Sequence, residues 1–156
     1  DPTDFGTSTI ATASTRRMTY VVKFSSNTGN FDVDEQITQS TTGAIGRVVE
    51  WDTSRKLLYY QQERFSTYGT ATTTQSFTAF SGANNITGST SGAVGTPSTT
   101  GSESVTLAGG NSITLTSGYA NPELAFDSGN IIYTENRKPI QRVSDQTEDI
   151  KIIIEF

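Results

Sequence analysis

The stretch AIGRVVEWDTSRKLLYYQQ, residues 44–62, predicts a β-hairpin. In its first half alternate side chains point to opposite faces, and one face carries Ile45, Arg47, Val49 and Trp51. Val48 and Glu50 belong to the other face. The polar tetrapeptide DTSR, residues 52–55, supplies the turn, and residues 56–61 return as the second strand.

Further strands are predicted on both sides of this hairpin. Residues 17–24, RMTYVVKF, have strand character, and SSNTGN at 25–30 is expected to form a polar turn. A second hairpin is predicted over residues 104–116, because two pairs of apolar residues face each other across AGGN: Val105 and Leu107 with Ile113 and Leu115. Helical periodicity is not sustained over more than about ten residues anywhere in the chain.

An internal repeat connects two parts of the chain. FDVDEQITQSTTGAIG at 31–46 resembles FSGANNITGSTSGAVG at 80–95, with a spacing of 49 residues. Phe31 matches Phe80, and Ile37 matches Ile86. The repeat predicts two equivalent turns in one small barrel or sandwich, with glycine where the backbone bends. Coincidence in a chain rich in Ser, Thr and Gly is the alternative.

Composition limits the function classes. The chain has 156 residues, which suit one domain with a sizeable insertion, and a net charge of −5. Nucleic acid is therefore not expected as a partner, and no apolar run approaches the length of a membrane span. The chain lacks Cys and His, which excludes disulfides, Cys/His zinc sites and Ser-His-Asp triads. The opening residues, DPTDFG, are expected to be the edge of a cleaved product.

Four local patterns resemble functional sites, and for each of them we favour a structural interpretation. Asp32, Asp34 and Glu35 could supply oxygens to Ca²⁺, but a solvated acidic turn is favoured. GAIG and GAVG are reminiscent of phosphate loops, yet no Lys-Ser or Lys-Thr follows. The sequon that begins at Asn85 is expected to be part of a turn. Trp51, Tyr59 and Tyr60 could form an aromatic platform that binds sugar, but we favour positions in the hydrophobic core for these side chains.

The C-terminal stretch SGNIIYTENRKPIQRVSDQTEDIKIIIEF, residues 128–156, is dense in charge. Residues 130–134 have strand character, and Pro139 holds the residue before it extended. Glu135, Asn136 and Arg137 therefore lie in a constrained bend, where the guanidinium fork can bind a carboxylate with two hydrogen bonds. The chain ends on a strand whose apolar face carries Ile150, Ile152, Ile154 and Phe156.

This stretch resembles the C-terminal part of a baseplate wedge protein from contractile-tailed, tevenvirus-like phages. The shared pattern is S-G-x-x-I-Y-x-E-N-R-x-P-I, then D-Q-T-E-x-I, then a short strand that ends in Phe. The resemblance implies a β-rich sandwich subunit without a catalytic role, which forms a homodimer and binds other wedge proteins. Residues 25–120 are expected to have no counterpart in the family. The segment predicted to lock the fold or to bind partners comprises Tyr133, Glu135, Asn136, Arg137, Pro139, Asp145, Gln146, Thr147 and Glu148.

We therefore predict a mainly β protein. Residues 1–24 and 121–156 are expected to form a β-sandwich base, and residues 25–120 a Ser/Thr/Gly-rich insertion, which is a small β-barrel or sandwich. The predicted function is that of a structural component of the tail baseplate wedge, assembled in the host cytoplasm, with no catalytic residue, cofactor or metal. A receptor- or glycan-binding tail domain is the main alternative. A tail-associated hydrolase with paired carboxylates is a more distant one.

Overall fold

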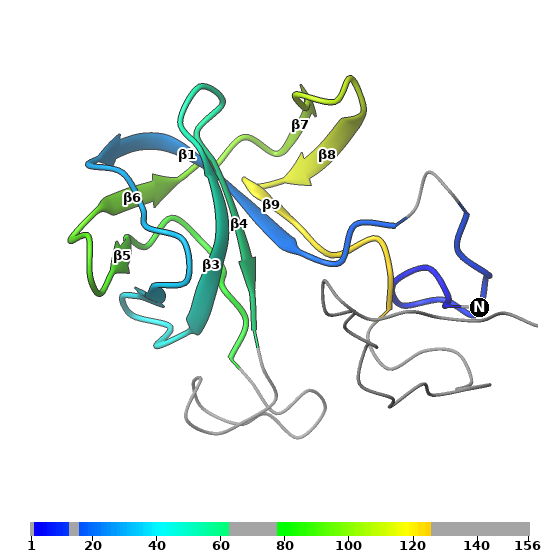
Figure 1. The fold of residues 1–156 in the computed structure, drawn as a ribbon, viewed down its shortest axis with the longest axis horizontal. Helices are drawn as coiled ribbons and strands as arrows, with labels where there is room; N and C mark the ends of the chain where they lie inside the picture. The colour runs from blue at the N-terminus through cyan, green and yellow to red at the C-terminus, as the bar shows by residue number, and fades with distance from the viewer. Residues whose placement is uncertain (1, 13–15, 63–77, 126–156) are drawn as a thin grey trace, which may run out of the picture.

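The computed structural model describes residues 2–12, 16–62 and 78–125. In these ranges the regular structure is all β, so the prediction of a mainly β protein is confirmed. Figure 1 shows nine labelled strands, which are β1 Tyr20–Thr28, β2 Gln36–Gln39, β3 Ile45–Asp52, β4 Leu57–Gln61, β5 Ile86–Gly88, β6 Val94–Pro97, β7 Ser102–Thr106, β8 Ser112–Thr116 and β9 Tyr119–Ala120. Within the described ranges, a helix long and apolar enough to span a membrane is not found.

Six of the strands form a closed ring of antiparallel pairings. The order along the sheet is β4-β3-β2-β5-β6-β1-β9-β8-β7, and β4 also pairs with β1. The additional pairing closes the ring β1-β4-β3-β2-β5-β6, while β9, β8 and β7 continue outward from β1. β1 can serve both sides of the closure because its register shifts between Phe24 and Ser26, and such irregularities bend a strand.

The core is divided into two hydrophobic clusters by β1 and β4. Cluster 1 belongs to the ring and its loops, and contains Tyr20, Val22, Phe24, Phe31, Ile37, Ala44, Val48, Leu58, Tyr60, Phe80, Ile86 and Ala93. Cluster 2 contains Val21, Leu57, Ile113 and Leu115. Successive residues of β1 and β4 thus enter opposite clusters, which explains why the runs YVV and LLYY do not alternate with polar residues.

Aromatic side chains provide much of cluster 1. The ring of Tyr60 stacks on Tyr20 at 5.5 Å between centroids and meets Phe80 edge-on at 4.7 Å. Trp51 lies 5.8 Å from Phe24 and donates from Nε1 to Asn30 Oδ1 at 3.2 Å. The core interpretation is therefore confirmed for Tyr60, whereas Trp51 packs against cluster 1 and Tyr59 against cluster 2, both partly buried.

Two details of the predicted strands were wrong. β1 continues through Ser25–Thr28 instead of turning there, because these polar residues pair with β6, and the chain turns only at Gly29 with φ of 75°. In β3 a bulge lies between Val48 and Glu50, so the predicted common face of Ile45, Arg47, Val49 and Trp51 does not exist. Val48 and Trp51 both pack on cluster 1, whereas Val49 is 40% exposed.

Both predicted hairpins are confirmed. β3 and β4 pair from Arg47↔Gln61 to Asp52↔Leu57. β7 and β8 also pair, but Val105 lies opposite Ile113 and Leu115 lies opposite Glu103, so the predicted pairing of Val105 and Leu107 with Ile113 and Leu115 holds only for Val105 and Ile113. β1 runs across the predicted domain boundary at residues 24 and 25, and the division into base and insertion stays a prediction.

The two ends of the described chain lie side by side. Asp4 forms a β-bridge with Leu124, and the amide of Phe5 donates to the carbonyl of Glu123 at 2.8 Å. Arg17 donates from Nη2 to the carbonyl of Asn121 at 2.7 Å and forms an ion pair with Glu123 at 3.8 Å. The segment before β1 is thereby fastened to the segment after β9.

Candidate assembly surfaces and the buried polar nodes behind them

The nine residues predicted to lock the fold or bind partners lie outside the described residues. They are Tyr133, Glu135, Asn136, Arg137, Pro139, Asp145, Gln146, Thr147 and Glu148. Their role stays a prediction, and the surfaces described below consist of other residues.

The two copies of the repeat form equivalent hairpins. β2 pairs with β3 through Ile37↔Gly46, and β5 pairs with β6 through Ile86↔Gly95, which is the same pair displaced by 49 residues. β2 and β5 then pair with each other around Thr38↔Thr87, two residues that are themselves 49 apart. A local pseudo-twofold axis therefore passes between these two threonines.

Glu35 is a buried polar node that reaches from the first copy into the turn of the second. Its side chain is 5% exposed. One carboxylate oxygen accepts from the amides of Thr90 and Ser91 at 2.9 Å each, and the other accepts from the Ser91 hydroxyl at 2.7 Å and the Asp32 amide at 2.8 Å. Burial raises the pKa of Glu35, but these hydrogen bonds outweigh it, and the net pKa is lowered.

The interpretation of residues 32–35 as a solvated acidic turn is therefore wrong for Glu35, although Asp32 and Asp34 are exposed. Among the residues that the structure describes, no group of three metal-ligating side chains is found. The carboxylate of Glu35 instead has a structural task, since it ties the turn of the second copy to the strand of the first.

Gln39 is the second buried node, and it is fully buried. Its Oε1 accepts from the Thr42 hydroxyl at 2.9 Å and from the Ser81 amide at 2.8 Å. Its Nε2 donates to the Asn84 carbonyl at 3.0 Å and to the Tyr119 hydroxyl at 2.9 Å. Burial raises the pKa of Tyr119 to about 12, so this hydroxyl stays protonated at neutral pH and donates to the carbonyl of Gly82 at 2.7 Å.

The Gly-rich segments that were weighed as phosphate loops form the turns of these hairpins. Gly43 has φ of 69° and Gly92 has φ of 67°, a conformation that favours glycine. Each segment leads into a strand, β3 or β6, and a phosphate loop would lead into a helix. Asn85, of the sequon, is exposed and accepts from the Thr96 hydroxyl at 2.9 Å.

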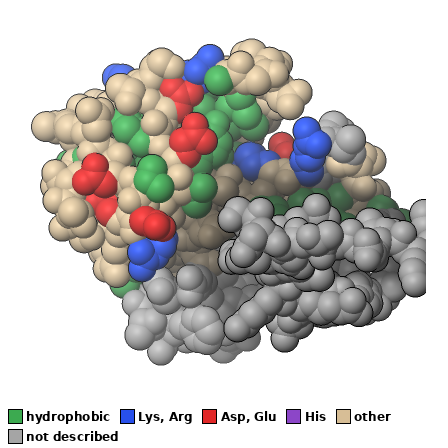
Figure 2. Space-filling view, in the orientation of Figure 1, with side chains coloured by type: hydrophobic (Ala, Val, Ile, Leu, Met, Phe, Trp, Pro, Cys, Tyr) green, Lys and Arg blue, Asp and Glu red, His purple; other side chains and the backbone are tan. Residues whose placement is uncertain are grey.

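The outer face of β3 carries the first candidate surface. Val33 is 66% exposed and Val49 is 40% exposed, with exposed Asp32, Asp34 and Glu50 beside them in sequence. The Asp34 amide donates to the Val48 carbonyl at 3.0 Å, which holds this loop against β3. Figure 2 shows acidic side chains around hydrophobic ones over this part of the molecule. An apolar centre with a polar rim is the composition of a small protein-contact surface.

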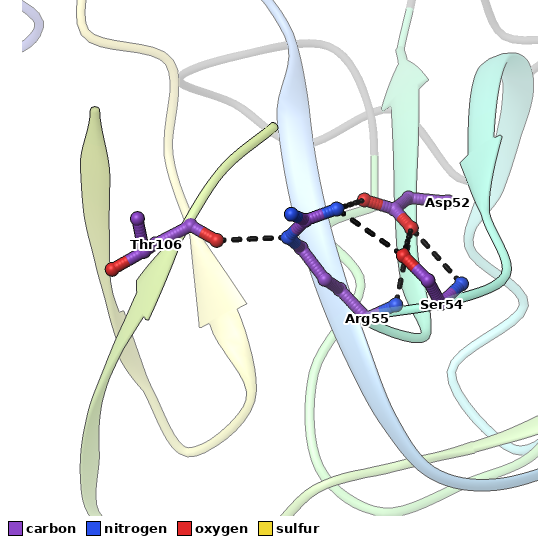
Figure 3. A network of polar contacts seen from close by, with 4 residues as sticks. All are labelled: Asp52, Ser54, Arg55 and Thr106. Atoms are coloured by element: carbon purple, nitrogen blue, oxygen red, sulfur yellow. Dashed lines mark hydrogen bonds and ion pairs between the residues drawn. The ribbon is translucent and has the colours of Figure 1, made fainter. Parts of the chain in front are cut away.

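The turn between β3 and β4 forms the second candidate surface together with β7. Asp52 accepts from the Ser54 amide and the Arg55 amide at 3.0 Å each, and forms an ion pair with Arg55 Nη1 at 2.9 Å. Arg55 Nε donates to the carbonyl of Thr106 at 2.8 Å (Figure 3). Burial raises the pKa of Asp52, but the bonds from Ser54 and Arg55 prevail and lower it.

Gln39 and Arg55 were not singled out from the sequence, and Glu35 was considered only as a ligand of Ca²⁺. The repeat offers a weak signal for Glu35 and Gln39, because both lie at positions where the two copies differ. Glu35 corresponds to Asn84, and Gln39 corresponds to Gly88. The copies also differ at exposed positions, such as Asp32 and Ser81, so a difference alone does not identify a buried side chain.

The described fold is that of a β-rich protein, and comparison with protein families identifies its family. Residues 45–156 match the family described as "Bacteriophage T4, Gp8", whose namesake is a baseplate wedge protein. The chain therefore belongs to this family of phage baseplate wedge proteins. No curated protein and no solved structure matches the chain.

The match extends far beyond the C-terminal stretch on which the resemblance was recognised. It begins at Ile45, the first residue of β3, and covers seven of the nine described strands, β3 to β9, together with all residues after them up to Phe156. The expectation that residues 25–120 have no counterpart in the family is therefore wrong for residues 45–120.

Proposed function

We propose that this chain acts in the assembly of the baseplate wedge by protein–protein contacts. The observation that carries the proposal is the family match over residues 45–156. A closed ring of strands with satisfied polar nodes suits this task, because a scaffold has to hold its surfaces in fixed positions. Its partners are other baseplate wedge proteins, and the chain itself is proposed to be a homodimer assembled in the host cytoplasm, with no enzymatic activity.

Cross-linking of purified phage particles, followed by mass spectrometry, tests this proposal. We expect cross-links from this chain to other baseplate proteins, and between two copies of the chain itself. A chain that is absent from the particles, or that cross-links only to fibre proteins, would contradict the assembly role and favour the receptor-binding alternative.

The bend with Glu135, Asn136 and Arg137 is our proposed fold-locking or interface element. Arg137→Ala removes the guanidinium and leaves a carboxylate without its partner, which costs roughly 1–3 kcal/mol if that carboxylate is buried. We expect a lower melting temperature or a loss of wedge assembly. Arg16→Ala, at an exposed arginine, is the matched control. An unchanged melting temperature together with normal assembly of the Arg137 variant would overturn this assignment.

A further inference from the structure

Among the strands that the structure describes, β7 has an open edge. It pairs only with β8, whereas each of the other eight strands pairs with at least two neighbours among the described strands. β7 therefore presents one row of backbone groups that other described strands leave unpaired. Edges of this kind are templates for the addition of another strand.

The hydrogen-bond pattern identifies which residues form the edge. The amide of Leu107 donates to Asn111 at 2.7 Å, and the amide of Ser117 donates to Gly101 at 3.2 Å, so the odd-numbered residues of β7 bond to β8. The N–H and C=O groups of Ser102, Ser104 and Thr106 therefore point to the open side. Arg55 agrees with this, since it approaches the carbonyl of Thr106 from outside the β7–β8 pair (Figure 3).

The edge lacks several of the features that usually prevent strand addition. The segment SESVT contains no Pro or Lys, and its register with β8 is continuous over five residues. The single acidic side chain, Glu103, forms an ion pair with Lys23, and Arg55 beside the edge is paired with Asp52. The charges beside the edge are thus already compensated, so an incoming strand needs no charge of its own here.

Cluster 2 also reaches this edge. Val105 and Leu107 pack against it but are only partly buried, while Ser102, Ser104 and Thr106 on the other face are exposed. A strand added beside β7 would place alternate side chains next to Val105, over cluster 2. Apolar side chains at these alternate positions would extend the cluster and complete its burial.

We propose that the open edge of β7 binds an extended strand of a neighbouring baseplate protein. That strand is uncharged next to Glu103 and carries apolar side chains at alternate positions, facing cluster 2. Its backbone bonds to Ser102 and Ser104, and Arg55 limits the pairing at the Thr106 end. This inference rests on the proposed function, because it takes the partner from the baseplate.

Amide hydrogen exchange of the wild-type chain provides the first test, both in isolation and in assembled baseplates. We expect the Ser104 amide to exchange fast in the isolated chain and at least about tenfold more slowly in the baseplate. The Val105 amide, which bonds within the sheet, is the internal control. Protection of Ser104 already in the isolated chain, or no protection after assembly, would overturn the proposal.

Ser104→Pro provides the second test, because proline removes only the N–H that points to the open side. We expect the variant to enter baseplates at least about tenfold less than the wild type. Ser104→Thr, which keeps the N–H, should enter normally. Normal entry of the proline variant into baseplates would contradict the proposal. If that variant does not fold, the exchange experiment on the wild-type chain is the deciding test. Absence of the wild-type chain from baseplates would instead contradict the proposed function.

Discussion

The two copies of the repeat share one backbone but differ in the buried polar side chain that each uses. In the first copy, Gln39 lies in its own hairpin and accepts from the hydroxyl of Thr42. In the second copy the equivalent residue is Gly88, and Glu35 enters from the first copy to accept from the hydroxyl of Ser91. Both turns thus receive a side-chain oxygen, and both oxygens come from the first copy.

The residues that the two copies share set the geometry of the hairpins, whereas residues that differ between the copies determine how the hairpins contact each other. The isoleucines and the Gly-Ala-x-Gly turns are shared, and they set the register of both hairpins. Glu35 and Gly88 occur in one copy each, and together they make the two hairpins interlock. A chain with two identical copies would place either two side chains or none in each turn.

The largest expected effect comes from Gly88→Ala. A methyl group at residue 88 would overlap the buried carboxylate of Glu35, and moving that carboxylate away would break its bonds to Thr90 and Ser91. We expect a loss of about 3 kcal/mol in the free energy of unfolding, measured by denaturant titration.

Gly109→Ala is the matched control, because nothing lies within 4 Å of the added carbon there. It should change the free energy of unfolding by less than about 0.5 kcal/mol. A sharper form of the test makes the second copy like the first. Gly88→Gln should be strongly destabilising alone, and Glu35→Asn should recover part of that loss. An absence of recovery would refute the equivalence of the two copies.

Glu35→Ala is the next largest change. It removes a buried carboxylate that accepts four hydrogen bonds, two of them from the amides of Thr90 and Ser91, and we expect a loss of about 2–3 kcal/mol in the free energy of unfolding. Glu103→Ala removes a carboxylate from a more exposed ion pair and should cost about 1 kcal/mol or less. Equal losses in the two variants would show that the buried carboxylate of Glu35 stabilises the fold no more than an exposed ion pair does.

Tyr119→Phe should have a smaller effect. It removes a hydroxyl that accepts from Gln39 and donates to Gly82, and the expected loss is about 1 kcal/mol. We expect this loss to be smaller when Gln39 is already Ala, because only the bond to Gly82 is then removed, and a double-mutant cycle measures the difference. Tyr59→Phe, in cluster 2, serves as the control. Independent, additive losses at Tyr119 and Gln39 would speak against a shared node.

A decrease in pH should have the smallest effect on the stability of the fold. The pKa of Glu35 is lowered in the folded chain, so its contribution is fully present above the unfolded value of about 4.5 and is lost as pH falls through the lower folded value. The slope for one proton is at most about 1.4 kcal/mol per pH unit. Thermal melts between pH 7 and pH 3 should therefore show a shallower decline for Glu35→Gln than for the wild type. Parallel declines would contradict this role of the carboxylate.

Much of the fold was predictable because local patterns agree with the tertiary structure. The hairpins at 44–62 and 104–116 carry alternating residues on both sides of a polar or Gly-rich turn, and both form as expected. The polar run at 25–28 was misleading, because Ser and Asn favour turns locally, whereas pairing with β6 keeps β1 extended. The bulge at Val49 also has no local signal, since it arises from the register with β4.

The burial of Glu35 could not be predicted, because a charged residue beside two aspartates is more often solvated and the two copies of the repeat also differ at exposed positions. Glu35 is buried only because the second hairpin folds over it, and that depends on a contact across 56 residues. The family assignment was predictable from the C-terminal pattern alone, and the match from residue 45 onward confirms it. The role of the residues that carry that pattern stays a prediction.

The most direct test of the baseplate wedge role is immunogold labelling of intact phage particles with an antibody raised against this chain. We expect gold at the baseplate, at the end of the tail. Gold at the tips of the fibres would contradict the wedge role and favour receptor binding. Particles without any gold, in a sample where the antibody recognises the dissociated chain, would contradict a place on the accessible surface of the virion.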